Sequence, residues 1–304
     1  MPSEPGAFFM SILSFFNALS AGYIKHYPYN RIFLNRYYTD RKDERQKYDL
    51  VFPKKAKGNL GLVLCIHGGG WVEGCKDSYT GSLFQVSENK GVAAACMNYR
   101  YVSENVSFGD VLDDITSALA AIRTKGAEYG VNFDKVLLTG ISAGGHLSLL
   151  YAYTKKDSAP IKPVCVVELC GPTDLENPFF YSVENRVGAS VGVEYFRNII
   201  SNGIGFDIDL DNFDTARNSM KKYSPINFVD ENAVPTVLGQ GEIDDIVPYR
   251  NSLDLDKKLT EFNVEHTFIS FPNSNHECEG KKSMSAIMKL FFEYIDTYLK
   301  EKQL

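Results

Sequence analysis

The sequence predicts an α/β protein in which a mostly parallel central sheet is flanked by helices, and three observations support this fold class. First, continuous apolar runs such as residues 60–66 and 92–98 are typical of strands buried on both faces of a parallel sheet. Second, helical patterns separate these runs, which predicts crossover helices on both faces. Third, 304 residues with 44% hydrophobic and 23% charged content are enough for one large domain.

The elements are expected in a regular order along the chain. The expected strands are residues 48–53, 60–66, 92–98, 136–138, 161–170, 234–239 and 265–271. The expected helices follow Asp77 and Ser142 and also cover residues 108–129, 253–262 and 283–299. The helix at 108–129 has apolar residues at helical spacing, namely Val111, Leu112, Ile115, Leu119 and Ile122.

Residues 1–45 are predicted to form a separate N-terminal helical segment before a domain that covers 46–304. The apolar stretch 7–24 allows two interpretations: an amphipathic helix that the protein retains, or a signal or anchor segment of a secreted or anchored protein. No basic residue precedes this stretch and Glu4 is acidic, which favours the retained helix. Asn17 and several serines make the stretch a poor membrane span, so no stable membrane insertion is expected.

Three other features depart from the regular alternation. The charged run 41–45 is expected to be a solvated surface face. Residues 175–222 are rich in Asn, Phe and Gly and contain no clear strand, which predicts a lid or an insertion at the carboxyl ends of the strands. Glu168 is unusual in the apolar run 161–170, where it either pairs with a neighbour or faces a functional site.

Charge and cysteine content narrow the classes of partner. The formal net charge of −6 argues against nucleic acid or an anionic membrane surface as a partner. The six cysteines include no C-x-x-C pair. Cys65, Cys96 and Cys165 lie in strand-like runs, which favours buried reduced thiols and a cytoplasmic protein.

A strand, a tight turn and a helix surround Ser142. The turn is Gly140-Ile141-Ser142-Ala143-Gly144, and glycine is expected on both sides because side chains there would collide around a strained serine backbone. The N–H groups at the start of the helix would point to where negative charge develops during acyl transfer. The pattern therefore indicates a nucleophilic serine, with the Ala143 N–H as one donor to the oxyanion.

Three consecutive glycines follow the expected strand at 60–66, in His67-Gly68-Gly69-Gly70-Trp71. Consecutive glycines are costly in conformational entropy, so they suit a loop whose backbone must approach another group closely. The alternative is a plain flexible loop.

A serine nucleophile needs a base, and histidine is the side chain that accepts and returns a proton near pH 7. The five histidines are His26, His67, His146, His266 and His276. His276 is the preferred base because it follows the last expected strand, at the edge where the carboxyl ends of the strands meet. Its alternative is a solvated loop histidine. The loop after the preceding strand offers Asp244 and Asp245 as the acid that orients the base.

At this point the sequence resembles the α/β-hydrolase superfamily, over about residues 48–299. The resemblance rests on residues 67–71, 98–100 and 140–146 and on the acid and the histidine. The superfamily's order of serine, acid and histidine implies a Ser142, Asp244 and His276 triad. Its G-x-x-D-x-x-V-P spacing selects Asp244, which leaves Asp245 as a turn residue.

Further site residues follow from similarity to the H-G-G-G-W group of this superfamily. In that group Gly69 and Gly70 would join Ala143 in the oxyanion hole, and His67 would shape the loop rather than act as the base. Relatives of hormone-sensitive lipase usually have Asp where this chain has Ile141, and Y-R-L-A-P-E where it has residues 99–104. Both differences favour the group that includes bacterial acetyl-xylan and feruloyl esterase-like enzymes.

The resemblance implies a carboxylic-ester hydrolase acting on small or medium acyl esters, a small-molecule substrate, with no metal or organic cofactor. An amide-bond hydrolase, such as an arylformamidase or a peptidase, would use the same triad. A ligand-binding protein on the same scaffold is a third possibility, although such proteins typically lose the histidine. An exposed N-terminal helix also leaves a homodimer open.

Overall fold

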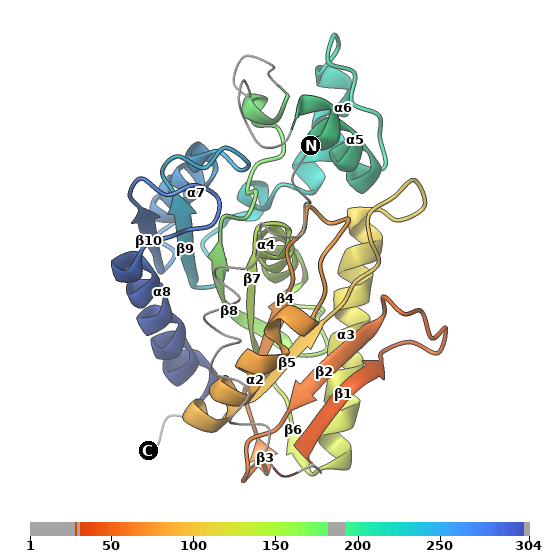
Figure 1. Ribbon diagram of the computed structural model, residues 1–304, viewed down its shortest axis with the longest axis vertical. Helices are drawn as coiled ribbons and strands as arrows, with labels where there is room; N and C mark the ends of the chain where they lie inside the picture. Colours follow the sequence, from red (N-terminus) through yellow and green to blue (C-terminus); the bar gives the residue numbers. More distant parts are fainter. Residues whose placement is uncertain (1–27, 29–30, 182–191, 301–304) are drawn as a thin grey trace, which may run out of the picture.

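An eight-stranded sheet runs through the computed structural model, which describes residues 28, 31–181 and 192–300 (Figure 1). The strand order is β1-β2-β5-β4-β7-β8-β9-β10. The strands are β1 (Ile32–Tyr37), β2 (Lys47–Val51), β4 (Leu62–Ile66), β5 (Ala93–Met97), β7 (Lys135–Ile141), β8 (Lys162–Leu169), β9 (Thr236–Gly241) and β10 (His266–Phe271). A small separate sheet joins β3 (Gly58–Asn59) to β6 (Val131–Asn132).

The six strands from β5 to β10 in this order are parallel, while β1 and β2 run antiparallel at one edge. Strands β4 and β5 are buried at every position, because both faces of the sheet are covered by helices. The mostly parallel α/β fold predicted from the alternation of apolar runs and helical patterns is confirmed.

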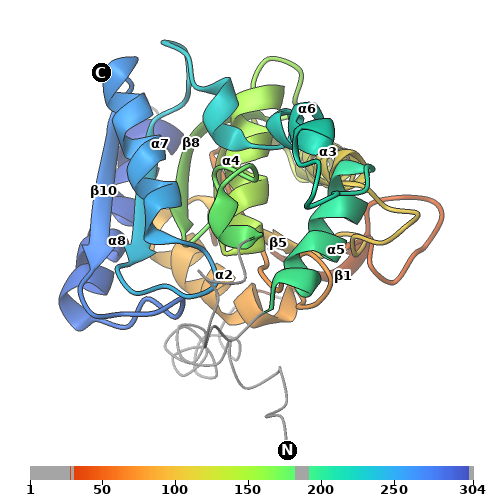
Figure 2. The ribbon, with the colours of Figure 1, turned by 90° about the horizontal axis from the view of Figure 1, so that it is seen from above.

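Helices cover both faces of the sheet, and the buried side chains on each face form a separate hydrophobic cluster. One cluster packs α2 (Asp77–Lys90) and α8 (Lys281–Tyr294) against one face, and a π-helical turn, Ile295–Leu299, extends α8. The other packs α3 (Phe108–Glu128), α4 (Ala143–Lys155) and α7 (Tyr249–Glu261) against the opposite face. Figure 2 shows α3, α4 and α7 together on one side of the molecule.

Local sequence signals fix the ends of the main helices. Helix α3 begins with a capping box, in which the Ser107 hydroxyl accepts the Asp110 N–H and the Asp110 carboxylate accepts the Ser107 N–H. Helix α2 ends at Gly91, which has a left-handed backbone with φ of 68°. These caps fix where the chain turns between helix and strand.

The carboxyl ends of β4, β7, β9 and β10 lie at the same edge of the sheet, because all four strands are parallel. The loops that follow carry His67, Ser142, Asp244 and His276 in that order. The topology therefore gathers residues that are more than 200 positions apart in sequence at one edge of the sheet.

The described residues of the segment 175–222 form helices joined by turns and contain no strand. After a short 3-10 turn, Pro178–Phe180, come α5 (Val193–Ile204) and α6 (Asp214–Lys222). Figure 1 shows α5 and α6 at the top of the molecule, above β7 and α4. The lid predicted for this segment stays a prediction, and its residues 182–191 lie outside the described part.

The prediction of a helical segment over residues 1–45 is wrong near its end, because Ile32–Tyr37 form strand β1. This strand pairs antiparallel with β2, with Ile32 opposite Val51 and Tyr37 opposite Lys47. Local periodicity missed it because an edge strand depends on its partner for its conformation. The stretch 7–24 and His26 lie outside the described residues.

The expectation for the charged run 41–45 holds for four of its five residues. Residues 41–44 are exposed, but the Arg45 side chain is half-buried and contacts His67.

In the described part of the chain, no helix is long and apolar enough to cross a membrane.

Candidate active site

Ser142 lies at a sharp turn between β7 and α4. Its backbone has φ of 56° and ψ of −124°, a conformation that L-residues rarely adopt. Two hydrogen bonds hold it: the Ser142 N–H donates to the Leu169 carbonyl at 2.7 Å, and the Ser142 carbonyl accepts the His146 N–H at 3.0 Å. The strained serine backbone expected from the sequence is therefore present.

The glycines on either side of the turn have the steric role predicted for them. A Cβ on Gly140 would lie 2.4 Å from the Gly144 backbone. A Cβ on Gly144 would lie 2.0 Å from the Ile66 carbonyl oxygen, at the end of β4. A larger residue at either position would push α4 away from the sheet and displace the serine.

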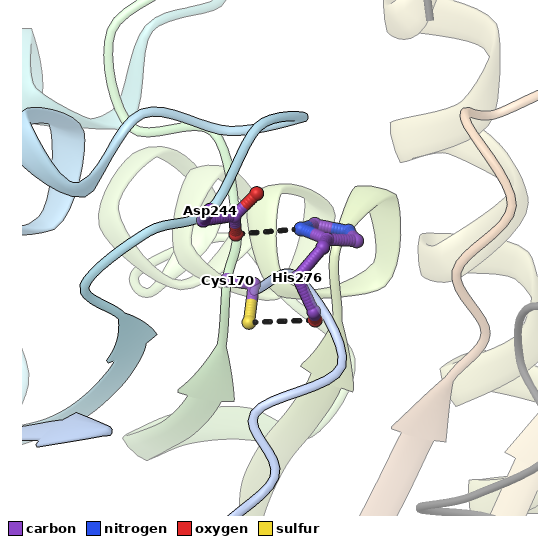
Figure 3. A group of neighbouring side chains, drawn as sticks. All are labelled: Cys170, Asp244 and His276. Atoms are coloured by element: carbon purple, nitrogen blue, oxygen red, sulfur yellow. Dashed lines mark hydrogen bonds and ion pairs between the residues drawn. The ribbon is translucent and has the colours of Figure 1, made fainter. Parts of the chain in front are cut away.

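Asp244 and His276 form a buried pair across the loops after β9 and β10. The His276 Nδ1 lies 2.7 Å from the Asp244 Oδ2 (Figure 3). The Asp244 Oδ1 accepts the backbone N–H groups of Ile246 and Val247, both at 2.9 Å. These donors stabilise an ionised carboxylate, which can only accept hydrogen bonds.

The carboxylate fixes the tautomer of His276. Because the Asp244 Oδ2 must accept, the His276 Nδ1 carries the proton, and Nε2 keeps a free lone pair. The Nε2 atom is buried and has no hydrogen-bond partner among the described residues. A buried imidazole oriented in this way is suited to take a proton from a neighbouring hydroxyl.

His67 and His146 make hydrogen bonds to other residues through both of their ring nitrogen atoms. The His67 ring contacts the Arg45 guanidinium through Nε2 and the Gly68 carbonyl through Nδ1, and burial lowers its pKa to about 3. The His146 Nδ1 accepts the Trp71 indole N–H, its Nε2 donates to the Tyr223 carbonyl, and burial lowers its pKa to about 4. Both rings are neutral near pH 7, and their nitrogen atoms are already paired.

The glycine loop after β4 has backbone conformations that require glycine. Gly69 has φ of 108° and Gly70 has φ of 54°. A Cβ on Gly69 would lie 2.4 Å from the Glu73 carbonyl oxygen. The N–H groups of Gly69 and Gly70 make no hydrogen bond to another described residue, so both are available as donors.

Glu168 lies behind the turn at Ser142. It is fully buried on β8, its Oε2 accepts the Gly171 N–H at 2.7 Å, and burial raises its pKa to about 8. That oxygen lies 2.6 Å from the position of a Cβ on Gly145, in the first turn of α4. The sequence left two interpretations of Glu168 open. Its contacts fit the first, in which the side chain pairs with a neighbouring residue.

Gln240 holds the Asp244 carboxylate and was not identified from the sequence. Its Nε2 donates to the Asp244 Oδ2 at 2.5 Å and to the Val247 carbonyl at 3.1 Å, while its Oε1 accepts the Ser252 hydroxyl at 2.9 Å. The available signal was a polar residue near the end of a buried strand, just before the loop that carries Asp244.

Cys170 lies next to the pair, and with Asp244 and His276 it has ligand atoms that all lie within 4.8 Å of one another (Figure 3). The three residues could hold a metal ion in principle. Their hydrogen bonds point to another use of these atoms, because Asp244 accepts from His276 and the Cys170 thiol donates to the His276 carbonyl at 3.4 Å.

Comparison with known proteins places the chain in a family. Residues 48–259, more than half of the chain, match the model of the family described as BD-FAE. The chain belongs to the BD-FAE family, an α/β-hydrolase family of the esterase type. The α/β-hydrolase resemblance seen in the sequence motifs is thereby confirmed.

The structural match supports the same fold. A solved structure titled bacterial heroin esterase aligns with a TM-score of 0.70 and 19% identity, covering 99% of this chain and 95% of that one. At this identity the likeness shows the α/β-hydrolase fold alone.

Two curated relatives match parts of the chain. A probable isoprenylcysteine α-carbonyl methylesterase of Arabidopsis thaliana is 28% identical over 46% of this chain and 29% of its own length. Dipeptidyl aminopeptidase BIII of Pseudoxanthomonas mexicana is 24% identical over 78% of this chain and 33% of its own length. The chain thus spans about a third or less of these relatives.

Proposed function

We propose that this BD-FAE family member is a carboxylic-ester hydrolase in which Ser142, Asp244 and His276 form the catalytic triad. The observation that carries the proposal is the His276 side chain, whose Nδ1 is hydrogen-bonded to Asp244 and whose buried Nε2 has no partner in the described part of the chain. This base lies at the same edge of the sheet as the strained turn at Ser142. The family assignment and the esterase relative support the same chemistry.

The proposed reaction has two steps. The Ser142 hydroxyl attacks the ester carbonyl while the His276 Nε2 takes its proton and passes it to the leaving alcohol. Water then attacks the acyl-enzyme, again with His276 as the base. Asp244 keeps the proton on Nδ1 and stabilises the charged imidazole.

The N–H groups of Gly69, Gly70 and Ala143 are proposed to bind the oxyanion. The glycine N–H groups have no other partner among the residues that the structure describes, and Ala143 begins α4, whose N-terminus carries a partial positive charge. Each such donor contributes about 3 kcal/mol to the stability of the transition state.

The proposed substrate is a small-molecule ester with a small or medium acyl group, and no metal or organic cofactor takes part. Helix α5, in the proposed lid at 175–222, borders the glycine loop after β4. A Cβ on Gly70 in that loop would lie 3.1 Å from the Tyr195 hydroxyl on α5. The cytoplasmic location expected from the sequence stays a prediction, and the sequence leaves a homodimer open.

Hydrolysis of p-nitrophenyl esters with increasing acyl length tests this proposal. We expect turnover of the shorter esters, and Ser142→Ala should reduce kcat at least about 10³-fold with an unchanged melting temperature. Ser158→Ala, an exposed serine just after α4, is the matched control and should retain full activity. Full activity in Ser142→Ala would contradict the proposal.

An amide-bond hydrolase is the second candidate, because the same groups would serve and the aminopeptidase match covers 78% of this chain. Matched ester and anilide substrates with the same acyl group distinguish the two. A kcat/KM ratio strongly in favour of the ester supports the first proposal, and a ratio near or below one supports the second.

A further inference from the structure

Arg45 is not part of the α/β-hydrolase motifs, but its side chain contacts the glycine loop after β4, residues 67–71. Its Nη2 lies 2.9 Å from the His67 Nε2 and donates to the Gly74 carbonyl at 3.1 Å. Its Nε donates to the Tyr99 carbonyl at 3.3 Å, and the guanidinium lies 3.9 Å from the centroid of the Tyr101 ring. Four contacts of this kind hold the planar group in one orientation.

The guanidinium determines which nitrogen of His67 carries the proton. An arginine side chain has only donors and stays charged, so the His67 Nε2 must accept. The proton of the neutral ring is then on Nδ1, which donates to the Gly68 carbonyl at 2.8 Å. The His67 ring stacks on Tyr99, with centroids 4.2 Å apart, and this contact limits its rotation.

The Gly68 carbonyl belongs to the same peptide unit as the Gly69 N–H. In a planar trans peptide the C=O and N–H bonds point in opposite directions. A hydrogen bond that fixes the Gly68 carbonyl therefore also fixes the direction of the Gly69 N–H. The contact from Arg45 to His67 thus sets the orientation of a proposed oxyanion donor.

Gly74 closes the same arrangement from the other side of the loop. Its carbonyl accepts both Arg45 and the Tyr101 hydroxyl, the latter at 2.6 Å. A Cβ on Gly74 would lie 2.4 Å from the Gly68 oxygen and 2.8 Å from the His67 Nδ1, so only glycine lets the chain at position 74 pass this close to the Gly68 peptide. Arg45 therefore holds both His67 and the Gly74 segment that lies beside the Gly68 peptide.

We propose that Arg45 is a positioning residue for catalysis: through His67 it orients the Gly68–Gly69 peptide so that the Gly69 N–H can bind the oxyanion. This inference rests on the proposed ester-hydrolase function. It gives a catalytic purpose to a residue of the charged run 41–45, which the sequence alone presents as surface.

Replacement of Arg45 by Ala, with Arg41→Ala as the matched control, tests the proposal. Arg41 lies in the same run and is exposed. We expect Arg45→Ala to lower kcat about 10² to 10³-fold, the loss typical of one oxyanion donor, with KM changed less than about threefold. Arg41→Ala should match the wild type in both constants.

Chemical rescue separates positioning from a general structural role. The Arg45 side chain is half-buried, so its removal leaves a site open to solvent. Guanidinium chloride at a sub-denaturing concentration should restore part of kcat in Arg45→Ala, whereas sodium chloride at the same concentration should not. Unchanged kcat in Arg45→Ala, or a loss without rescue that follows a lowered melting temperature, would overturn the proposal.

An independent measurement does not depend on activity. In protein with ¹⁵N-labelled histidine, the His67 ring, assigned by its absence in His67→Asn, should be protonated at Nδ1 and unprotonated at Nε2 in the wild type. Arg45→Ala should lose this single tautomer. A wild-type ring protonated at Nε2 would refute the positioning mechanism, whereas a wild type inert toward esters would refute the proposed function instead.

Discussion

The Asp244 carboxylate is the most fully bonded side chain of the candidate site. Its two oxygens accept four donors, from His276, Gln240 and the N–H groups of Ile246 and Val247. Donors at both oxygens leave little freedom to rotate, so the carboxylate fixes the His276 ring as well. The arrangement explains why Asp244 rather than its neighbour Asp245 suits the role of the acid.

Replacement of Asp244 by Asn tests this role. The amide can present its NH₂ group to His276 Nδ1 and so favour the wrong tautomer, and we expect kcat to fall about 10⁴-fold on a short ester. Asp245→Asn is the matched control and should stay within about threefold of the wild type. Equal losses in the two variants would show that the acid has been assigned wrongly.

At the scale of elements, a buried ion pair joins helix α2 to the antiparallel edge of the sheet. Lys76, at the start of α2, lies 2.9 Å from the carboxylate of Asp49 on β2, and both side chains are only 2% exposed. Asp49 also accepts the Asn35 N–H at 2.7 Å, where the pairing of β1 with β2 shifts register. One carboxylate thus stabilises β1, β2 and α2 together.

Lys76→Met should lower the free energy of unfolding by about 3–5 kcal/mol, because it leaves the Asp49 charge buried without its partner. Urea denaturation of the variant measures this loss. Addition of Asp49→Asn should recover part of the stability, since the uncompensated charge is then removed. Lys289→Met, at an exposed pair on α8, should change stability by less than about 1 kcal/mol. A loss equally small in Lys76→Met would refute a structural role for the pair.

At the scale of the whole molecule, Glu168 couples stability to pH. Burial raises its pKa from 4.5 to about 8, so the folded protein holds a proton that the unfolded chain releases between these values. Across this window the unfolded state binds fewer protons, and the stability of the wild type falls as pH rises. Above about pH 8 both states are ionised and this dependence ends.

Glu168→Gln removes this titration. The stability of the variant relative to the wild type should increase by about 1.4 kcal/mol per pH unit between pH 5 and pH 8. Urea denaturation at several pH values measures the difference, and Glu231→Gln, at an exposed position, should show no such trend. A constant difference for Glu168→Gln would mean that the folded protein ionises Glu168 at its ordinary pKa.

The sequence predicted all six parallel strands, and most of them, such as β4 and β5, are short apolar runs that can be recognised without knowledge of their partners. Loops after parallel strands meet at one edge, which singled out His276 and two candidate acids, Asp244 and Asp245, and the superfamily's spacing then selected Asp244. Strand β1 and the contacts of Arg45 and Gln240 were missed. The strand and the contacts of both side chains depend on residues outside their own local segment. Neither hydrophobic periodicity nor a local motif can therefore predict them.

Covalent labelling of the folded protein with a fluorophosphonate probe tests the central claim most directly. Such a probe reacts with a serine only when a neighbouring base activates the hydroxyl. Intact mass and peptide mapping should show one adduct, on Ser142, that is absent from Ser142→Ala and forms much more slowly in Asp244→Asn. No adduct on the folded wild type, or an adduct on another residue, would contradict an activated nucleophile at Ser142.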